Sequence, residues 1–396
     1  MSSVQPPQGH AELKVTDETI NGEAAAELCI RLETCNVSSL HLENCSVTDW
    51  SFLQAPSLVS LTIERLRCER SLALLEEALP SHLERLVLRH CSLEYAAGGR
   101  LLASFRRLIN LKQLEITLCK LCNLQSMRLG RQLQYLDLSE NHIDNLDWLA
   151  MQTMTSELTF LSLSDNNLGT YQLDRLIHVP HLEELDVSHN EICSDGVQYL
   201  LQAKLPLRRL NLECCWVGHR GSFLVAELLK TTPTLEYLNI SDNVWGDVGT
   251  IRIVRDGLCH SSSIQYLNLA ANNITEEGAL VLAATVLTDH VSLQGLGLSR
   301  NSRISSTGWN ALAKAVACNP RLDTVETFGN ALLFHENGIA MIRLDLDVLR
   351  TVKLTRLLEE ERSQFWPLLL SKIANEFEWG YGLIFELLRR KPAIVV

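Results

Sequence analysis

The stretch LQYLDLSENHI, residues 133–143, has leucine at its first, fourth and sixth positions, asparagine at its ninth and isoleucine at its eleventh. The same frame returns as LTFLSLSDNNL from Leu158 and as LEELDVSHNEI from Leu182. Self-similarity at a spacing of 20 to 50 residues is typical of a repeat architecture. The other copies, which bring the total to twelve at spacings of 21 to 29 residues, begin at Val37, Leu58, Leu83, Leu111, Leu207, Leu235, Ile264, Leu293 and Leu322.

The frame predicts a short strand in every repeat. Its apolar residues at positions one, four and six point to one side, and each unit buries that side only against its neighbours. The ninth position follows the strand, where a polar side chain can bridge backbone groups of successive turns. It holds Asn or Cys in eleven of twelve copies, so we expect the thiol to replace the amide there. The twelve residues are Cys45, Leu66, Cys91, Cys119, Asn141, Asn166, Asn190, Cys215, Asn243, Asn272, Asn301 and Asn330.

From about residue 37 to residue 345 this frame resembles the leucine-rich-repeat family. The resemblance implies a curved α/β solenoid with a concave parallel sheet and helices on the convex side. The later copies, 28 or 29 residues long, are similar to the ribonuclease-inhibitor-like subclass. Apolar spacings of three and four predict full helices over residues 247–258, 276–287 and 306–316. The shorter units between residues 37 and 206 predict less helix and a flatter, less regular front half.

Both ends of the solenoid need a cap, because a terminal repeat exposes its core. Residues 1–36 are predicted to form an N-terminal cap with a helix from Gly22, and residues 37–345 to form the solenoid. Residues 346–396 are predicted to form a C-terminal cap of two amphipathic helices that break near Gly380 and Gly382. A helical docking surface that ends in the basic run at residues 389–391 is the alternative interpretation of this segment.

Composition restricts the functional class. Of the 396 residues, 75 are leucine, and the formal net charge is -12. That charge argues against binding to nucleic acid or to an anionic membrane, and no apolar run reaches the length of a membrane span. The N-terminus lacks the pattern of a signal peptide. We therefore expect a cytoplasmic location, with the twelve cysteines as free thiols.

The sequence contains no motif that indicates catalysis. It has no phosphate-binding loop, no metalloprotease HExxH pair and no serine-hydrolase elbow. The pair Cys119 and Cys122 has no second CxxC, which argues against zinc. We expect no enzyme activity, no cofactor and no metal. A cation held by carboxylates and one histidine is a weaker alternative, and its ligands would be Glu140, Asp165, Asp186 and His189.

The best candidate for a functional site is the concave face, where the strand residues between the buried leucines point outward. Exposed aromatic residues ringed by polar groups are typical of binding hot spots, and carboxylates steer a basic partner. A solvated polar face with tyrosine as a common filler is the alternative interpretation. The predicted protein-binding residues are Tyr135, Asp137, Glu140, Phe160, Asp165, Glu184, Asp186, Tyr237 and Tyr266.

These observations predict a non-catalytic intracellular scaffold or adaptor that binds a protein, and the carboxylates of the concave face favour a partner with a basic surface. The oligomeric state is left open. The alternative is a regulator of an enzyme, because the ribonuclease-inhibitor-like subclass includes activators of the Ran GTPase. Those activators carry a long acidic tail, whereas residues 350–396 hold eight basic and six acidic residues, so no catalytic residue is transferred. A ubiquitin-ligase substrate receptor would need a docking box, for which residues 1–36 are too short and too polar.

Overall fold

The computed structural model describes residues 11–67, 69–93, 96–151, 157–285, 292–319, 321–322 and 324–327. It divides the chain into two units, residues 1–243 and residues 244–396. The predicted C-terminal cap and Asn330 lie outside the described residues. The domain boundaries drawn from the sequence stay predictions.

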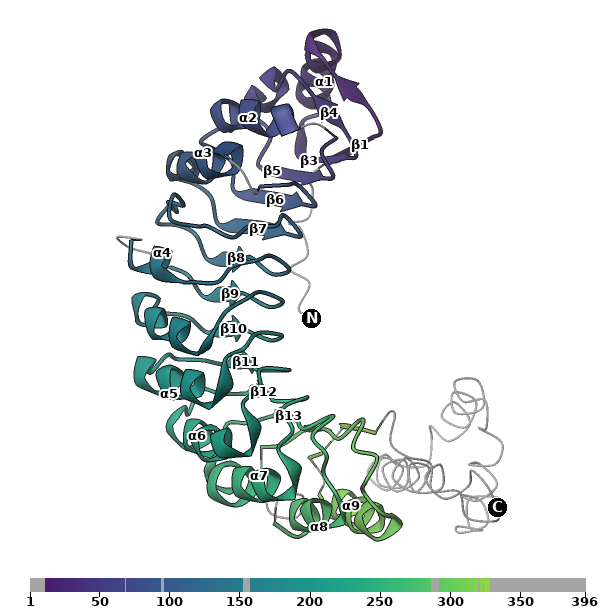
Figure 1. Cartoon of the computed structure of the whole chain (residues 1–396). Helices are drawn as coiled ribbons and strands as arrows, with labels where there is room; N and C mark the ends of the chain where they lie inside the picture. Colours follow the sequence, from purple (N-terminus) through teal and green to yellow (C-terminus); the bar gives the residue numbers. More distant parts are fainter. Residues whose placement is uncertain are drawn as a thin grey trace, which may run out of the picture. The chain divides into compact units, whose positions relative to one another are not determined.

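The first unit is built on a parallel sheet, with its strands in a row on one side and the helices on the other (Figure 1). Each predicted repeat contributes one strand, and neighbours pair in the order β1-β3-β5-β6-β7-β8-β9-β10-β11-β12. The leucines at positions four and six are buried; Leu136 and Leu138 are fully so. The strands are β1 Ala11–Thr16, β3 Val37–Glu43, β5 Ser60–Glu64, β6 Arg85–Arg89, β7 Gln113–Thr117, β8 Tyr135–Asp137, β9 Phe160–Ser162, β10 Glu184–Asp186, β11 Arg209–Asn211 and β12 Tyr237–Asn239.

The opposite side of the first unit varies from repeat to repeat, as the unequal spacings predict. Four repeats of 25 or 28 residues accommodate helices of nine to fourteen residues, α2, α3, α5 and α6, whereas the 25-residue repeat that begins at Leu133 holds the four-residue α4. The shorter ones hold a single turn or a 3-10 segment. The elements are α1 Gly22–Thr34, η1 Ser51–Gln54, α2 Glu69–Ala78, α3 Ala96–Ser104, η2 Phe105–Arg107, α4 Asp147–Ala150, η3 Thr170–His178, α5 Cys193–Ala203 and α6 Gly218–Thr231.

Residues 11–36, the segment predicted to form the N-terminal cap, contain the predicted helix and two strands, β1 and β2, that the sequence did not predict. Helix α1 begins at Gly22, where the Asn21 side chain accepts a hydrogen bond from the Ala24 amide. Strand β1 pairs in parallel with β3, which places Leu13 beside Leu40. A second, two-stranded sheet joins β2 Thr19–Ile20 to β4 Ser46–Val47. The cap therefore supplies backbone partners to the first repeat as well as covering its core.

The ninth residue, where it is Asn or Cys, ties its repeat to the one before it; Leu66 has no polar side chain for this contact. The Asn166 amide nitrogen donates to the carbonyl of Leu138 in the preceding repeat at 3.0 Å, and its oxygen accepts from the Ile143 N–H at 2.9 Å. Cysteine keeps the donor half of this role, since the Cys215 thiol donates to the Val187 carbonyl at 3.2 Å. The prediction that a thiol replaces the amide is confirmed. The same donor contact is made by Cys45, Cys91, Cys119, Asn141, Asn190, Asn243 and Asn301.

The second unit continues the repeat pattern, with one helical segment after each of its strands β13 and β14. Its strands pair in the order β13-β14-β15. The helix predicted over residues 247–258 is wrong in its second half: α-helix ends at Arg252, and a π turn and a 3-10 turn follow, in which Ile253, Val254 and Leu258 are all buried. The elements are β13 Tyr266–Asn268, β14 Gly295–Gly297, β15 Thr324–Glu326, α7 Gly246–Arg252, η4 Ile253–Gly257, η5 Leu258–His260, α8 Glu276–Thr285 and α9 Ser306–Cys318.

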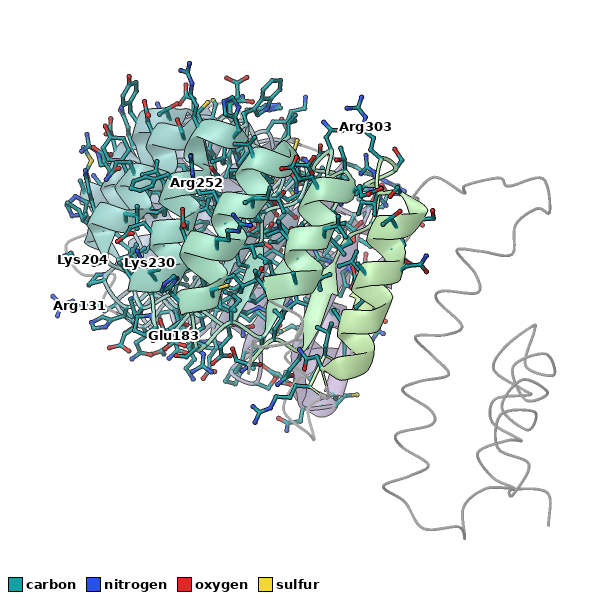
Figure 2. All side chains as sticks on the ribbon, turned by 90° about the horizontal axis from the view of Figure 1, so that it is seen from below. Arg131, Glu183, Lys204, Lys230, Arg252 and Arg303 are labelled. Carbon is teal, nitrogen blue, oxygen red and sulfur yellow. The ribbon has the colours of Figure 1, made fainter. Side chains whose placement is uncertain are left out.

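Charged side chains lie where the helices of the first unit end. In Figure 2, Lys204 and Lys230 mark the C-terminal ends of α5 and α6, where a cation is stabilised by the helix dipole. The Arg208 guanidinium, just before β11, donates to Glu236 at 2.7 Å.

Within the described ranges, no helix combines the length and hydropathy of a membrane span.

The ladder of ninth residues makes a stability prediction. Replacing Asn166 by Ala leaves the Ile143 N–H buried without its partner and removes one of the two side-chain donors to the Leu138 carbonyl, the other being Asn141. The free energy of unfolding should therefore fall by about 1–3 kcal/mol. Asn166→Cys restores the donor only and should lose clearly less. Urea unfolding followed by circular dichroism measures both. Equal losses for the two variants would contradict the role given to the thiol.

A second prediction concerns the helix packing of the second unit. A Cβ on Gly278 would lie 2.6 Å from the Asp247 carboxylate, which accepts hydrogen bonds from the Thr275 and Gly278 amides at 2.8 and 3.0 Å. Gly278→Ala should therefore lower the melting temperature, at a cost of about 1–3 kcal/mol. Gly99→Ala in α3 is the matched control. A Cβ there would lie 3.9 Å from its nearest neighbour, the Ser126 hydroxyl oxygen, so the helix propensity of alanine should stabilise that variant.

Candidate functional site

The sheet face opposite the helices in the first unit carries two columns of side chains. Residues one place before and one place after the fourth-position leucine point away from the core, and the in-register pairing of β7 to β12 aligns them. The first column is Gln113, Tyr135, Phe160, Glu184, Arg209 and Tyr237. The second column is Glu115, Asp137, Ser162, Asp186, Asn211 and Asn239.

The two predicted aromatic anchors, Tyr135 and Phe160, form a stacked pair. Their ring centroids are 4.1 Å apart and their planes differ by 6°. Strands β8 and β9 hold the two Cα atoms directly opposite each other, which leaves the rings parallel along the column. Both side chains are half-buried. The pair is therefore a preformed apolar surface that needs no rearrangement to accept a ligand.

The third predicted anchor, Tyr237, is covered by the protein's own arginine. The Arg209 guanidinium carbon lies 4.3 Å from the centroid of the Tyr237 ring, and Arg209 Nε is 3.7 Å from the Glu184 carboxylate. The cation thus lies between a carboxylate and an aromatic ring. Tyr266 lies on β13 in the second unit and is described with that unit alone. The structure brings together seven of the nine predicted residues, which we call the acidic-aromatic patch: Tyr135, Asp137, Glu140, Phe160, Asp165, Glu184 and Asp186.

Two carboxylates of the patch are fixed by the turns that follow their strands. The Asp137 Oδ1 atom accepts hydrogen bonds from the Ser139 N–H at 2.9 Å and from the Ser139 hydroxyl at 2.6 Å. Ser188 binds Asp186 in the same way, and the Asn211 amide donates to the second oxygen of Asp186 at 2.9 Å. These contacts fix the orientation of both carboxylates.

Negative charge accumulates around the aromatic pair. Burial, together with the charges of Glu115 and Asp186, raises the pKa of Asp137 even though hydrogen bonds from Ser139 oppose the shift. The pKa of Tyr135 is raised by burial and by the charges of Asp137 and Glu115. The three strand and turn segments 135–142, 160–167 and 184–191 contain six carboxylates and no Lys or Arg. A positive charge would therefore be stabilised here.

Glu140 and Asp165 extend the patch along the rim of the sheet. Both occupy the turn residue before the ninth position, with φ of 55° and 51°, and both are exposed. His189 occupies the equivalent turn position. The described part of the chain contains no cluster of three or more His, Cys, Asp or Glu side chains placed to hold a metal ion.

Three exposed aromatic residues did not stand out in the sequence: Tyr171, Trp216 and Phe223. Trp216, in the turn after the ninth position Cys215, has 72% of its surface exposed and a φ of 58°. Its signal was a tryptophan at the tenth frame position, where the neighbouring copies have His142, Asn167 and Glu191. It lies outside the patch and serves below as a control.

Comparison with known proteins agrees with this architecture. Two models of the leucine-rich-repeat family match residues 131–192 and 260–283. A solved internalin from Listeria monocytogenes is similar over 81% of this chain and 88% of its own, with a TM-score of 0.51 at 18% identity, which bears on the fold alone. The chain is a leucine-rich-repeat protein.

Its relatives include the ribonuclease-inhibitor type. The ribonuclease inhibitor of Sus scrofa is 34% identical over 89 residues, which are 20% of this chain and 19% of that protein. The human NACHT, LRR and PYD domains-containing protein 14 is 31% identical over 133 residues, 32% of this chain and 12% of that protein. The matches thus span less than a fifth of either relative's length.

The charge of the patch makes a pH prediction. Because the pKa of Asp137 is raised in the folded state, the protonated acid favours folding, and this contribution is lost as the pH rises above about 4. Asp137→Asn should therefore be at least as stable as the unaltered protein at pH 7 and lose that advantage below pH 4. Asn239 makes the equivalent hydrogen bonds to Ser241, so the amide fits. Urea unfolding across pH 3.5 to 7.5 measures the effect; a variant less stable at pH 7 would contradict it.

Proposed function

We propose that the first unit is a non-catalytic protein-binding adaptor whose acidic-aromatic patch contacts a partner with a basic surface. The observation that carries this proposal is the stacked pair Tyr135–Phe160 beside fixed carboxylates. Rigid aromatic side chains bind at low cost in conformational entropy, and polar groups around them exclude water. The carboxylates contribute orientation and a faster encounter with a basic protein.

We also propose that the protein works inside the cell. Four thiols of the ninth-position ladder donate hydrogen bonds to backbone carbonyls, and only a reduced cysteine can do so. This structural use of the thiol supports a reducing compartment such as the cytoplasm.

The test compares native-lysate pull-downs of the full chain with those of a Tyr135/Phe160/Asp186 triple alanine variant, quantified by mass spectrometry. Loss of both rings should weaken partner binding by about 2–4 kcal/mol, which removes the partner from the captured set. The side chains lie on the sheet face and outside the core, so the variant should stay folded, and its melting temperature should fall less than that of Leu136→Ala.

Trp216→Ser is the matched control, because it removes an exposed ring outside the patch and should leave the partner bound. Leu136→Ala is the stability control and should lose about 2–5 kcal/mol of folding free energy. Partners retained equally by the unaltered chain and the triple variant would refute the proposal.

A further inference from the structure

We propose that the acidic-aromatic patch binds an arginine side chain of the partner, and that it prefers arginine to lysine. This inference rests on the proposed function and specifies the chemistry of the partner: a protein segment that presents an exposed guanidinium group.

The protein itself contains one example of the contact. Arg209 lies between the carboxylate of Glu184, 3.7 Å away, and the ring of Tyr237, 4.3 Å away, in the first column. The paired strands β10, β11 and β12 set this spacing. A column of parallel strands therefore offers the right separation for a guanidinium between an acid and a ring.

On its other side Glu184 also has an aromatic neighbour, but Phe160 lies on the adjacent strand, so an arginine would have to reach this acid and ring from outside the sheet. Phe160 is the neighbour of Glu184 on β9 and stacks on Tyr135. The Glu184 side chain is 37% exposed, and its 3.7 Å separation from Arg209 exceeds hydrogen-bond distance. Its carboxylate can therefore accept hydrogen bonds from an incoming group that rests against Phe160.

The surrounding charge favours a cation at this place. Asp137 and Asp186 lie in the second column, on the strands of Tyr135 and Glu184, and their orientation is fixed by Ser139 and Ser188. Burial, together with the charges of Glu115 and Asp186, raises the pKa of Asp137. A positive charge relieves the repulsion between these carboxylates. The patch is thus arranged in advance for a positive group.

Two properties distinguish arginine from lysine here. The guanidinium is planar, so it can lie against an aromatic ring while its N–H groups donate in a fork to a carboxylate. An ammonium group is a compact and strongly hydrated point charge, which gains less from a ring. A patch that offered charge alone would not separate the two residues.

The experiment uses two synthetic peptides of equal length and charge, acetyl-GSRGRSG-amide and acetyl-GSKGKSG-amide. Their affinities for the full chain are measured by isothermal titration calorimetry. The arginine peptide should bind about fivefold more tightly than the lysine peptide. In the Tyr135→Leu/Phe160→Leu double variant, which keeps apolar volume and removes the rings, the two affinities should become equal. Trp216→Ser should retain the preference.

Equal binding of the two peptides to the unaltered chain, or no binding of either, overturns the inference. Glu184→Gln provides an independent variant with an unchanged shape, in which the arginine peptide should bind at least threefold more weakly; unchanged affinity there also contradicts the proposal. The pull-down separates the two proposals. A cellular partner lost with the triple alanine variant, while the peptides bind equally, leaves the adaptor function in place and removes the arginine preference.

Discussion

The structure depends on one requirement, that the polar backbone groups between stacked repeats be hydrogen-bonded where water cannot reach them. The ninth residue, where it is Asn or Cys, meets it. Its side chain donates to the carbonyl of the sixth residue of the preceding repeat, as Asn166 does to Leu138 and Cys215 to Val187. A residue without polar side-chain atoms would remove a donor from the buried carbonyl and, where the residue is Asn, an acceptor from a buried N–H of the preceding repeat. This favours Asn and Cys at a position that hydrophobic burial alone would give to leucine.

The functional geometry follows from the same contacts. Because each repeat is tied to the previous one at a fixed point, neighbouring strands pair without slippage, and equivalent side chains meet across the sheet. Tyr135 stacks on Phe160, and Arg209 reaches both Glu184 and Tyr237, for this reason. The patch is therefore as rigid as the sheet that carries it.

Much of the fold could be predicted from the sequence, because each copy of the frame has apolar residues and a hydrogen-bonding residue at the same positions. All twelve copies form strands, and the thiol substitution at Cys119 and Cys215 is found. Strand β1 was missed because Glu18 stands where its ninth residue would be, so only Leu13, Val15 and Ile20 keep the pattern.

The site was less predictable, because it depends on how side chains meet. The positions in the repeat identified the aromatic pair. The contact of the Arg209 guanidinium with the Tyr237 ring depends on side-chain conformations, which the spacing of residues in the sequence does not specify. Tyr266 has the frame position of Tyr237 and belongs to a different unit. The GTPase-activator alternative stays a prediction, because it depends on a partner that no residue pattern here specifies.

The hydrogen-bond ladder also gives the chain a polarity, since every rung faces backward along the sequence. The two ends of such a stack have unlike chemical needs. A leading cap has to present carbonyl acceptors, as β1 does where the Val15 carbonyl accepts a hydrogen bond from the Cys45 thiol. In the middle of the stack, the asparagine of the next repeat accepts a hydrogen bond from a backbone N–H group, as Asn301 does from the Ile274 N–H. The last repeat has no such asparagine after it, so a trailing cap has to supply the acceptor. Caps exchanged between the two ends would therefore leave unmatched groups, even where their shapes fit.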